Sequence, residues 1–446
     1  MRITMIGGGY VGLVSGACFA EFGTDVTVVE ADAGKLAALR EGRMPIYEPG
    51  LDKLVAENVA AGRLSFTGDL AEGVKGAEAV FIAVGTPTRR GDGHADLTYV
   101  YAAVEQVARA LPEPAVPEPP VIVTKSTVPV GTGRRIQDIV RAARPDLDIH
   151  VASNPEFLRE GNAIGDFMRP DRVVIGAESD RAREVLGRLY RPLNLIETPI
   201  LYTGIETAEL TKYAGNAFLA MKVTFINEMA DLCEKVGADV HDVARGIGLD
   251  GRIGRKFLHP GPGYGGSCFP KDTLALVRTA QDHGAPSRLV EATVLVNDAR
   301  KSSMAMRVIQ ACGGSVRGKT IGVLGLTFKP ETDDMRDSPS LPIVSRLAGD
   351  GAIIRAFDPE GMEQARPLLP ETVTYCRDAM DAVTGADAVV LVTEWNEFRA
   401  LSPTRLRAAM KGAVLVDLRN AWDPVAMRQA GFAYHGIGRA GPKARP

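Results

Sequence analysis

The sequence predicts an α/β protein with two Rossmann-like, doubly wound domains, joined by a long central helix and a helical middle domain. From the first residue onward, short apolar runs of strand type alternate with helical patterns, which is typical of parallel βαβ units. The segment 204–236 keeps apolar residues at helical spacing throughout, so it predicts one long helix. A second series of strand-like runs starts at Gly318. A chain of 446 residues is also too long for one compact core.

The expected elements follow the chain in this order. In the first series the strands are Ile3–Ile6, Val26–Val29, Ala79–Ala83 and Val121–Thr124. The long helix carries apolar residues at Leu210, Ala214, Ala217, Met221 and Phe225. In the second series the strands are Thr320–Leu324, Ile353–Phe357, Val389–Val392 and Val414–Asp417. We expect the proline-rich stretch 111–120 to be a surface loop and the tail after Arg439 to be disordered.

Charge and composition give no sign of a nucleic-acid or membrane partner. A formal net charge of -3 gives no reason to expect nucleic acid or a membrane surface as a partner. No apolar run approaches the length of a membrane span, and no signal peptide is visible. The five cysteines are scattered and odd in number, without C-x-x-C spacing. We therefore expect no metal site and a reducing, cytoplasmic location.

A dinucleotide fingerprint opens the chain. Gly7, Gly9 and Gly12 form G-x-G-x-x-G directly after the first expected strand and at the start of a helix. The three glycines allow a tight turn, close approach to a pyrophosphate, and packing of helix on sheet. Glu30 ends the second strand, where a carboxylate accepts from ribose hydroxyls and repels a 2′-phosphate. The pattern predicts NAD rather than NADP, with a solvated strand-end carboxylate as the alternative interpretation of Glu30.

A second candidate cofactor contact is Thr86, in the sequence Gly85-Thr86-Pro87. It follows an expected strand, and ligands of open α/β sheets lie at the carboxyl ends of the strands. A simple β-turn explains the same three residues equally well.

One cysteine differs from the rest in its surroundings. Cys268 lies in GYGGSCFPKD, among glycines, a lysine and an aspartate, whereas the other four cysteines are expected to be small buried hydrophobes. In a dehydrogenase, a thiol can trap an aldehyde as a thiohemiacetal, which loses a hydride to become a thioester that water hydrolyses. The local sequence alone does not decide between this nucleophile and an inert thiol.

Two pairs of polar residues are spaced four apart. Lys212 and Asn216 project from one face of the long helix, where they are suited to stabilise an oxyanion, although an ordinary solvated face explains them better. Glu156 and Glu160 repeat the spacing in NPEFLREG. A carboxylate there is either a general base or a cap of the helix that Pro155 is expected to start.

Together these motifs resemble the UDP-glucose/GDP-mannose dehydrogenase family, and most closely its bacterial UDP-glucose branch. The resemblance covers nearly the whole chain, through motifs that occur in the family's order. These are GGGYVG, VGTP, KSTVPVGT, NPEFLREG, ELTKYAGNAFLAMKVTFINEM, GYGGSCFPKD, GLTFKPETDDMRDSP and DLRN. It implies a two-step, NAD-dependent oxidation of UDP-glucose at C6 to UDP-glucuronate, in a homodimer.

The resemblance also implies a role for individual residues. The implied catalytic residues are Cys268, Lys212, Asn216, Asp272, Glu156 and Thr127. The implied cofactor contacts are Gly7, Gly9, Tyr10, Val11, Gly12, Glu30, Lys35, Thr86, Glu160 and Arg336. The implied contacts to the UDP-sugar are Phe157, Leu158, Arg252, Tyr264, Gly265, Phe328, Lys329 and Arg419. The family usually has Asp where this chain has Glu30, which keeps the carboxylate and changes its reach.

By the same resemblance the chain divides into three domains. Residues 1–200 are expected to bind NAD, 201–300 to form a helical dimerisation domain with catalytic residues, and 310–440 to bind the UDP-sugar. Three alternatives remain: a sibling enzyme acting on GDP-mannose or a UDP-N-acetyl-hexosamine, a β-hydroxyacid dehydrogenase that needs no cysteine, and a non-enzymatic protein that binds NAD or nucleotide sugars. Intact Cys268, Lys212, Asn216 and Asp272 argue against the last.

Overall fold

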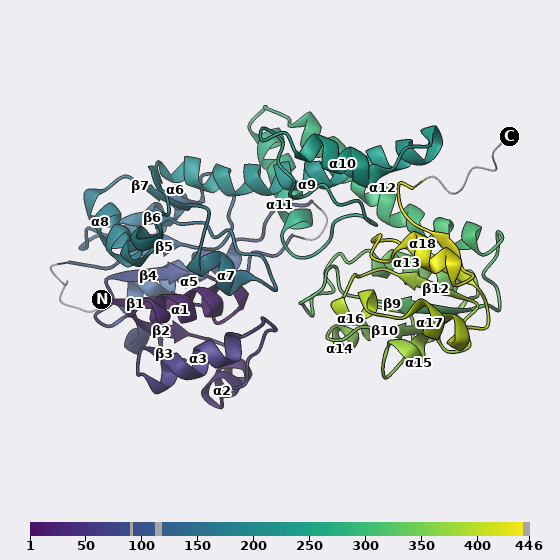
Figure 1. Cartoon of the computed structure of the whole chain (residues 1–446). Helices are drawn as coiled ribbons and strands as arrows, with labels where there is room; N and C mark the ends of the chain where they lie inside the picture. Colours follow the sequence, from purple (N-terminus) through teal and green to yellow (C-terminus); the bar gives the residue numbers. More distant parts are fainter. Residues whose placement is uncertain (90–91, 112–117, 440–446) are drawn as a thin grey trace. The chain divides into compact units, whose positions relative to one another are not determined.

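The computed structural model describes residues 1–89, 92–111 and 118–439, and the chain folds into two compact units. The first unit comprises residues 1–215 and 278–285, and the second comprises 216–277 and the chain from 286 onward. Most of the proline-rich stretch 111–120 and the tail after Arg439 lie outside the described residues. Each unit contains one β-sheet (Figure 1).

The first unit is built on an eight-stranded sheet with the order β3-β2-β1-β4-β5-β6-β7-β8. Its strands are β1 (Arg2–Ile6), β2 (Asp25–Val29), β3 (Leu64–Thr67), β4 (Ala79–Ile82), β5 (Val121–Thr124), β6 (Val151–Ser153), β7 (Val173–Ala177) and β8 (Ile200–Thr203). All neighbours pair in parallel except β6 and β7, which are antiparallel. The parallel sheet follows from the alternating pattern, but the antiparallel pair was not predicted.

Helices cover both faces of this sheet. They are α1 (Tyr10–Glu21), α2 (Ala33–Arg40), α3 (Leu51–Ala60), α4 (Leu70–Val74), α5 (Thr98–Ala110), α6 (Thr132–Ala143), α7 (Ala163–Met168), α8 (Asp180–Leu189) and the 3₁₀ helix η1 (Arg191–Ile196). Met5 and Phe81 pack in the cluster that includes α1, α3 and α8. Their strand neighbours Ile6 and Ile82 pack in the cluster that includes α5 and α6. Alternate strand residues therefore face opposite helical layers, as a doubly wound sheet requires.

Four helices form the middle of the chain. They are α9 (Ile205–Val236), α10 (Val240–Gly248), α11 (Phe269–Asp282) and α12 (Arg288–Ala311). The predicted long helix is confirmed, since α9 is continuous for 32 residues (Figure 1). Among the described residues, no helix is both long enough and apolar enough to cross a membrane.

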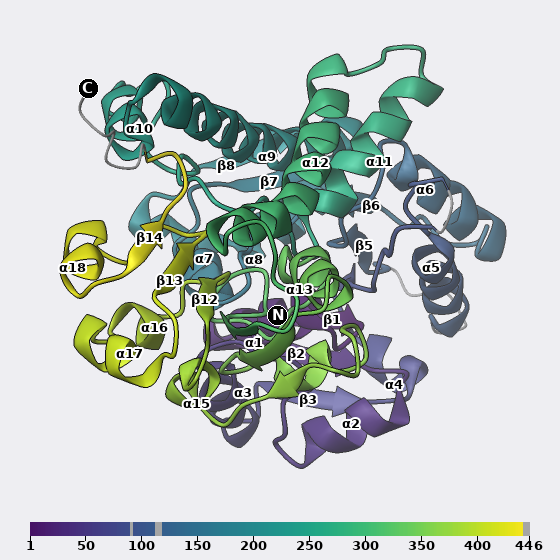
Figure 2. The ribbon, with the colours of Figure 1, turned by 90° about the vertical axis from the view of Figure 1, so that its right-hand side faces the viewer.

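The second unit contains a fully parallel six-stranded sheet with the order β11-β10-β9-β12-β13-β14. Its strands are β9 (Thr320–Leu324), β10 (Ile353–Phe357), β11 (Thr374–Tyr375), β12 (Ala388–Leu391), β13 (Val414–Asp417) and β14 (Ala433–His435). Its helices are α13 (Ser340–Gly349), α14 (Met362–Ala365), α15 (Ala379–Val383), α16 (Asn396–Arg399), α17 (Pro403–Ala409) and α18 (Pro424–Gln429). Figure 2 shows β12, β13 and β14 side by side.

The first six strands of the first sheet have the same order as the six strands of the second sheet. In both, the first strand of the series has the second and third on one side and the fourth, fifth and sixth on the other. This is the strand order of Rossmann dinucleotide-binding domains. The predicted fold class, with two Rossmann-like domains and a helical middle region, is confirmed.

Candidate active site

The glycine turn after β1 has the geometry of a dinucleotide cradle. Gly7 has a φ of 104°, and a Cβ at Gly12 would lie 1.9 Å from the Gly7 carbonyl oxygen. A Cβ at Gly9 would meet nothing within 4 Å, so open space lies in front of the N-terminus of α1. Gly7 and Gly12 are thus required by the turn itself, whereas Gly9 leaves room for a pyrophosphate at a helix N-terminus.

Glu30 lies directly beside this turn. One carboxylate oxygen accepts from the Gly8 backbone N–H at 2.9 Å, and the other accepts from the Asp32 N–H at 2.8 Å. The side chain is therefore fixed at the carboxyl end of β2, where a ribose is bound in this fold. Lys35 is exposed in the first turn of α2, which Asp32 caps.

A carboxylate that the sequence analysis missed connects this turn to the NPEFLREG segment. Glu48 is buried and accepts from the Tyr10 hydroxyl and from the backbone N–H groups of Gly161 (2.6 Å) and Ala163 (2.7 Å). Burial and Glu48 together raise the pKa of Tyr10. Glu160 is half-buried next to Gly161. Nothing in the local sequence YEPG points to this role, because it depends on contacts 113 residues away.

Two motif threonines meet at the carboxyl ends of neighbouring strands. The Thr86 hydroxyl, after β4, donates to the backbone carbonyl of Thr127, after β5, at 3.0 Å. Ser126 adds a second link by donating to the Val84 carbonyl at 2.7 Å. The VGTP and KSTVPVGT segments are thereby held together at the sheet edge where ligands bind in this fold.

Lys212 and Glu156 form a buried ion pair. The Lys212 Nζ lies 3.0 Å from a Glu156 carboxylate oxygen, and their side chains are 3% and 5% exposed. Burial opposes ionisation of Glu156, but the charge of Lys212, the Leu158 backbone N–H and the charge of Lys125 together hold its pKa below the usual value. The pair can hold or move a proton at a position shielded from water.

Lys125 is a second buried cation near this pair, and the sequence analysis missed it. Its Nζ donates to the backbone and side-chain oxygens of Asn154, at 3.3 and 3.1 Å, and to the Tyr190 hydroxyl at 3.3 Å. Burial lowers the pKa of Lys125 to about 8, while the charge of Glu156 opposes that shift. Within the motif KSTVPVGT nothing distinguishes Lys125 from an exposed lysine, because the sequence does not show that its side chain is buried.

The expected helix at Pro155 is wrong. Residues 154–159 have no regular structure, and α7 starts only at Ala163. Glu156 therefore does not cap a helix, because its carboxylate binds Lys212 and the Leu158 N–H. The ring of Phe157 is half-buried and lies 3.6 Å, at its centroid, from the Arg172 guanidinium. Leu158 packs against the core of the first unit.

Cys268 lies at the N-terminus of α11 in the second unit. Its carbonyl accepts from the Asp272 backbone N–H at 2.8 Å, and its Sγ lies 3.5 Å from the Ser267 hydroxyl. It is half-buried, whereas Cys18, Cys233, Cys312 and Cys376 are buried. The positive end of a helix dipole stabilises negative charge on a thiolate.

Asp272, one turn into α11, is 1% exposed. One of its carboxylate oxygens accepts from the Asn216 side-chain amide at 2.6 Å, and the other pairs with the Lys271 Nζ at 2.7 Å. Two donors thus fix the Asp272 carboxylate, one turn of α11 after Cys268. Asn216 in turn lies one helical turn from Lys212 in α9.

The glycine-rich segment before Cys268 packs tightly on the GLTFKPETDDMRDSP segment. A Cβ at Gly265 would lie 2.4 Å from the Asp337 carbonyl oxygen, and Gly266 donates its N–H to the Arg336 carbonyl at 2.8 Å. Only glycine permits these approaches. Tyr264 is buried, which raises its pKa to about 12.

The remaining predicted residues of the second unit are Phe328 and four basic residues. Arg419, after β13, donates to the carbonyls of Val392 (2.7 Å) and Phe328 (2.8 Å), which brings DLRN against the segment containing half-buried Phe328 and Lys329. Arg336 pairs with Asp334 at 2.8 Å and is largely exposed. Arg252 is 90% exposed and pairs with Asp250.

The predicted residues thus divide between the two units. The first unit holds Gly7, Gly9, Tyr10, Val11, Gly12, Glu30, Lys35, Thr86, Thr127, Glu156, Phe157, Leu158, Glu160 and Lys212. The second holds Asn216, Arg252, Tyr264, Gly265, Cys268, Asp272, Phe328, Lys329, Arg336 and Arg419. Within the described residues, no group of three or more His, Cys, Asp or Glu side chains is placed to hold a metal ion.

Three family models match the chain in order. They are the NAD binding domain of the UDP-glucose/GDP-mannose dehydrogenase family over residues 1–194, the central domain of that family over 206–299, and its UDP binding domain over 322–424. A UDP-glucose 6-dehydrogenase from Rhizobium meliloti (strain 1021) is 62% identical over 441 residues, which cover 98% of this chain and 100% of that protein.

Two solved structures extend the similarity to the whole fold. A UDP-glucose dehydrogenase from Pyrobaculum islandicum has a TM-score of 0.89 and 38% identity, covering 98% of both chains. A UDP-D-ManNAc dehydrogenase from Pyrococcus horikoshii has a TM-score of 0.85 and 26% identity, covering 98% of this chain and 99% of that one. The full-length match sets aside both the β-hydroxyacid dehydrogenase and the non-enzymatic alternatives. The chain belongs to the UDP-glucose/GDP-mannose dehydrogenase family, and its cofactor is NAD.

Proposed function

We propose that the protein oxidises UDP-glucose at C6 to UDP-glucuronate, through a covalent intermediate on Cys268. The observation that carries this proposal is the position of Cys268, half-buried at the N-terminus of α11, one turn before a carboxylate fixed by two donors. The Rhizobium meliloti relative, which matches from end to end, is named a UDP-glucose 6-dehydrogenase. When bound, NAD supplies the hydride acceptor for each of two successive oxidations.

In the first oxidation, an alcohol becomes an aldehyde as it loses a proton from oxygen and a hydride from carbon. Lys212 is suited to stabilise the alkoxide, because its side chain is buried and paired with Glu156. The loop that carries Thr127 is fixed by the Thr86 hydrogen bond, so we assign Thr127 to holding the reacting hydroxyl.

In the second oxidation, the Cys268 sulfur adds to the aldehyde carbon, and the thiol proton passes to a neighbouring base. Loss of a second hydride converts this thiohemiacetal to a thioester. Water then attacks the thioester, which releases the carboxylate and returns the thiol. Each stage keeps the sugar attached to the protein or held in its site.

Asp272 and Glu156 are the carboxylates that we assign to proton transfer. Asp272 retains lone pairs for a water molecule after accepting from Asn216 and Lys271. Glu156 is kept ionised by Lys212, so it can accept a proton from the attacking water.

We assign the nucleotide end of the substrate to the C-terminal part of the chain. The Arg419 guanidinium donates to the Phe328 carbonyl, and Lys329 follows Phe328 in the sequence. Positive side chains of this kind neutralise a diphosphate. Residues 1–200 are then the NAD-binding domain, 201–300 the domain of the catalytic helices, and 310–440 the UDP-sugar domain.

We also propose that the protein is a homodimer. Helix α9 exposes Phe218 (57%), Phe225 (46%) and Leu232 (51%) at seven-residue spacing, so they form one apolar stripe. The occupant that we assign to this stripe is the same helix of a second copy, because a repeating apolar seam on a long helix is suited to helix pairing.

Activity on a panel of nucleotide sugars tests the substrate. Reduction of NAD should be at least tenfold faster with UDP-glucose than with GDP-mannose or UDP-N-acetylglucosamine, on the order of what one missing or clashing group in a pocket produces. Activity with only one of the other sugars would mean that this sugar is the substrate, and the cysteine chemistry would still apply. No activity with any of them would overturn the proposal.

A further inference from the structure

The glycine-rich loop at residues 260–266 is buried along its whole length, yet it has no helix or strand. A buried backbone still needs hydrogen-bond partners for its N–H and C=O groups. Here side chains from α9 and α12 supply several of them, and all of the groups involved belong to the second unit. We propose that Asn227, Asn297 and Arg300 are positioning residues that hold this loop and, through it, Cys268.

The first anchor is at Tyr264. The amide of Asn297, in α12, accepts from the Tyr264 backbone N–H at 2.8 Å and donates to the Tyr264 carbonyl at 3.1 Å. One side chain thus satisfies both backbone groups of one residue, as a neighbouring strand would. The approach needs Gly263, since a Cβ there would lie 2.9 Å from the Asn297 side-chain oxygen.

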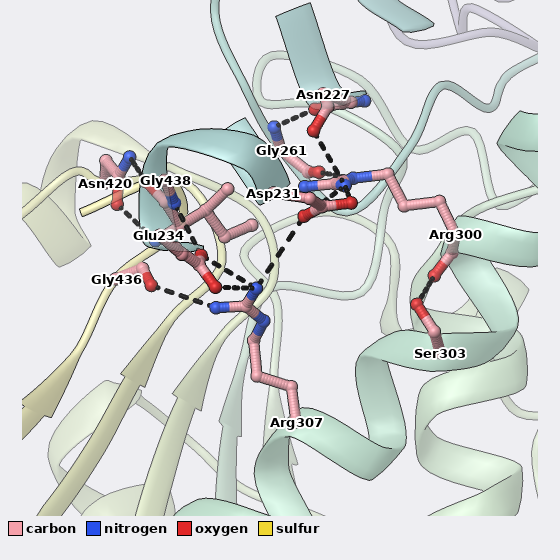
Figure 3. A network of polar contacts seen from close by, with 11 residues as sticks. Asn227, Asp231, Glu234, Gly261, Arg300, Ser303, Arg307, Asn420, Gly436 and Gly438 are labelled. Atoms are coloured by element: carbon pink, nitrogen blue, oxygen red, sulfur yellow. Dashed lines mark hydrogen bonds and ion pairs between the residues drawn. The ribbon is translucent and has the colours of Figure 1, made fainter. Parts of the chain in front are cut away.

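The second anchor is at Gly261 (Figure 3). Its N–H donates to the side-chain oxygen of Asn227, in α9, at 2.8 Å, and its carbonyl accepts from the Arg300 Nε at 2.7 Å. Arg300 is itself fixed, because its Nη1 donates to the Asn227 carbonyl at 3.2 Å and pairs with Asp231 at 2.9 Å. Both Asn227 and Arg300 are buried, so this anchor is shielded from bulk water.

The two anchors lie directly upstream of the proposed chemistry. Tyr264 is four residues before Cys268, and between them Gly266 donates to the Arg336 carbonyl at 2.8 Å. The backbone leading to the thiol is therefore fixed at three points. A shift of about 1 Å at a reacting group costs on the order of a hundredfold in rate, so loosening either anchor should impair the reaction without removing a catalytic group.

The same pair of helices offers a matched control. Arg307, in α12, pairs with Glu234, in α9, at 2.8 Å and donates to the Gly436 carbonyl at 3.2 Å (Figure 3). Glu234 also accepts from the Gly438 N–H at 2.7 Å. This part of the network joins the same helices by a similar ion pair. Arg307 also lies 3.9 Å from Asp231, the partner of Arg300, but its backbone contact is to the segment at 436–438 rather than to the loop at 260–266.

The test uses the full-length protein and a readout that does not depend on activity. Because the other four cysteines are buried, the rate of alkylation by iodoacetamide reports on Cys268, and Cys268→Ser gives the background. The variants are Asn297→Ala and Arg300→Lys, one for each anchor, with Arg307→Lys as the control. Melting temperature, alkylation rate, kcat and KM are measured for each.

We expect both loop variants to alkylate several-fold faster than the wild type and to lose on the order of ten- to a hundredfold in kcat. Arg307→Lys should match the wild type in both readouts, even where its melting temperature falls as much as that of Arg300→Lys. The inference would be overturned if a folded loop variant had the alkylation rate and kcat of the wild type. It would also be overturned if Arg307→Lys changed both quantities as much as the loop variants do. The expected loss in kcat rests on the proposed function. The alkylation rate does not, so it tests the anchors even if UDP-glucose is not the substrate.

Discussion

The Lys212 ammonium lies 3.0 Å from the Glu156 carboxylate, and both side chains are almost completely buried. Two opposite charges in such a place stabilise each other strongly, because water does not screen them. Removing one partner leaves the other charge without compensation in a medium that solvates it poorly. Breaking the pair on one side should therefore destabilise the first unit as well as impair the chemistry assigned to it.

Replacing Lys212 with methionine should therefore have two separable effects. Activity should be lost, and the unfolding free energy should fall by about 3–5 kcal/mol, because Glu156 remains buried and unpaired. Chemical denaturation and NADH formation measure the two effects. In the double variant with Glu156→Gln, stability should largely return while activity stays absent. Loss of activity without loss of stability in the single variant would contradict this description of the pair.

Gly9 and Gly12 should respond differently to the same substitution. A Cβ at Gly9 has open space and a backbone φ of -77°, so Gly9→Ala should melt at the wild-type temperature without NAD. It should weaken NAD binding on the order of tenfold or more, because the new methyl group occupies space assigned to the pyrophosphate. Gly12→Ala should instead unfold at a lower temperature, since its Cβ would lie 1.9 Å from the Gly7 carbonyl oxygen. Calorimetry with and without NAD measures both, and unchanged NAD affinity in Gly9→Ala would count against the cradle.

Glu209, in α9, is buried at the N-terminus of α6. Its carboxylate oxygens accept from the backbone N–H groups of Gly131 and Gly133, each at 2.7 Å. Burial nevertheless raises the pKa of Glu209 from 4.5 to about 7. Between these two values the folded protein binds a proton that the unfolded chain has released, so stability falls as pH rises through this window.

The variant Glu209→Gln removes this titration. Relative to the variant, the wild type should lose stability from pH 5 to pH 7, by up to about 1.4 kcal/mol per pH unit, and the difference should then level off. Melting temperatures of both proteins at four pH values across this range are sufficient. A constant difference between the two proteins would show that Glu209 does not titrate there.

Much of the fold could be predicted because its signals are local. Four of the expected strands, at Val121–Thr124, Thr320–Leu324, Ile353–Phe357 and Val414–Asp417, have the bounds that the structure gives them. The glycine turn was predictable for the same reason, since its three glycines form one short motif directly after a strand. The prediction of a helix at Pro155 was wrong, because the Glu156 side chain forms an ion pair with Lys212, which is 56 residues away.

The site residues that the sequence analysis missed act over long range. Glu48 joins segments 113 residues apart, and Asn297 holds a residue 33 positions upstream. Lys125 has an ordinary position in its motif, and only burial makes its charge important. The number and type of such residues in a sequence carry no sign of these contacts, which depend on how the units fold.

In the proposed four-electron oxidation, Cys268 carries a covalent intermediate. The most direct measurement is the amount of NADH formed per UDP-glucose consumed, at saturating NAD, by the wild type and by Cys268→Ser. The wild type should form two NADH per UDP-glucose, and the variant should show no sustained turnover, because a serine ester or aldehyde adduct does not resolve normally. One NADH per UDP-glucose in the wild type, or sustained two-NADH turnover in Cys268→Ser, would contradict it.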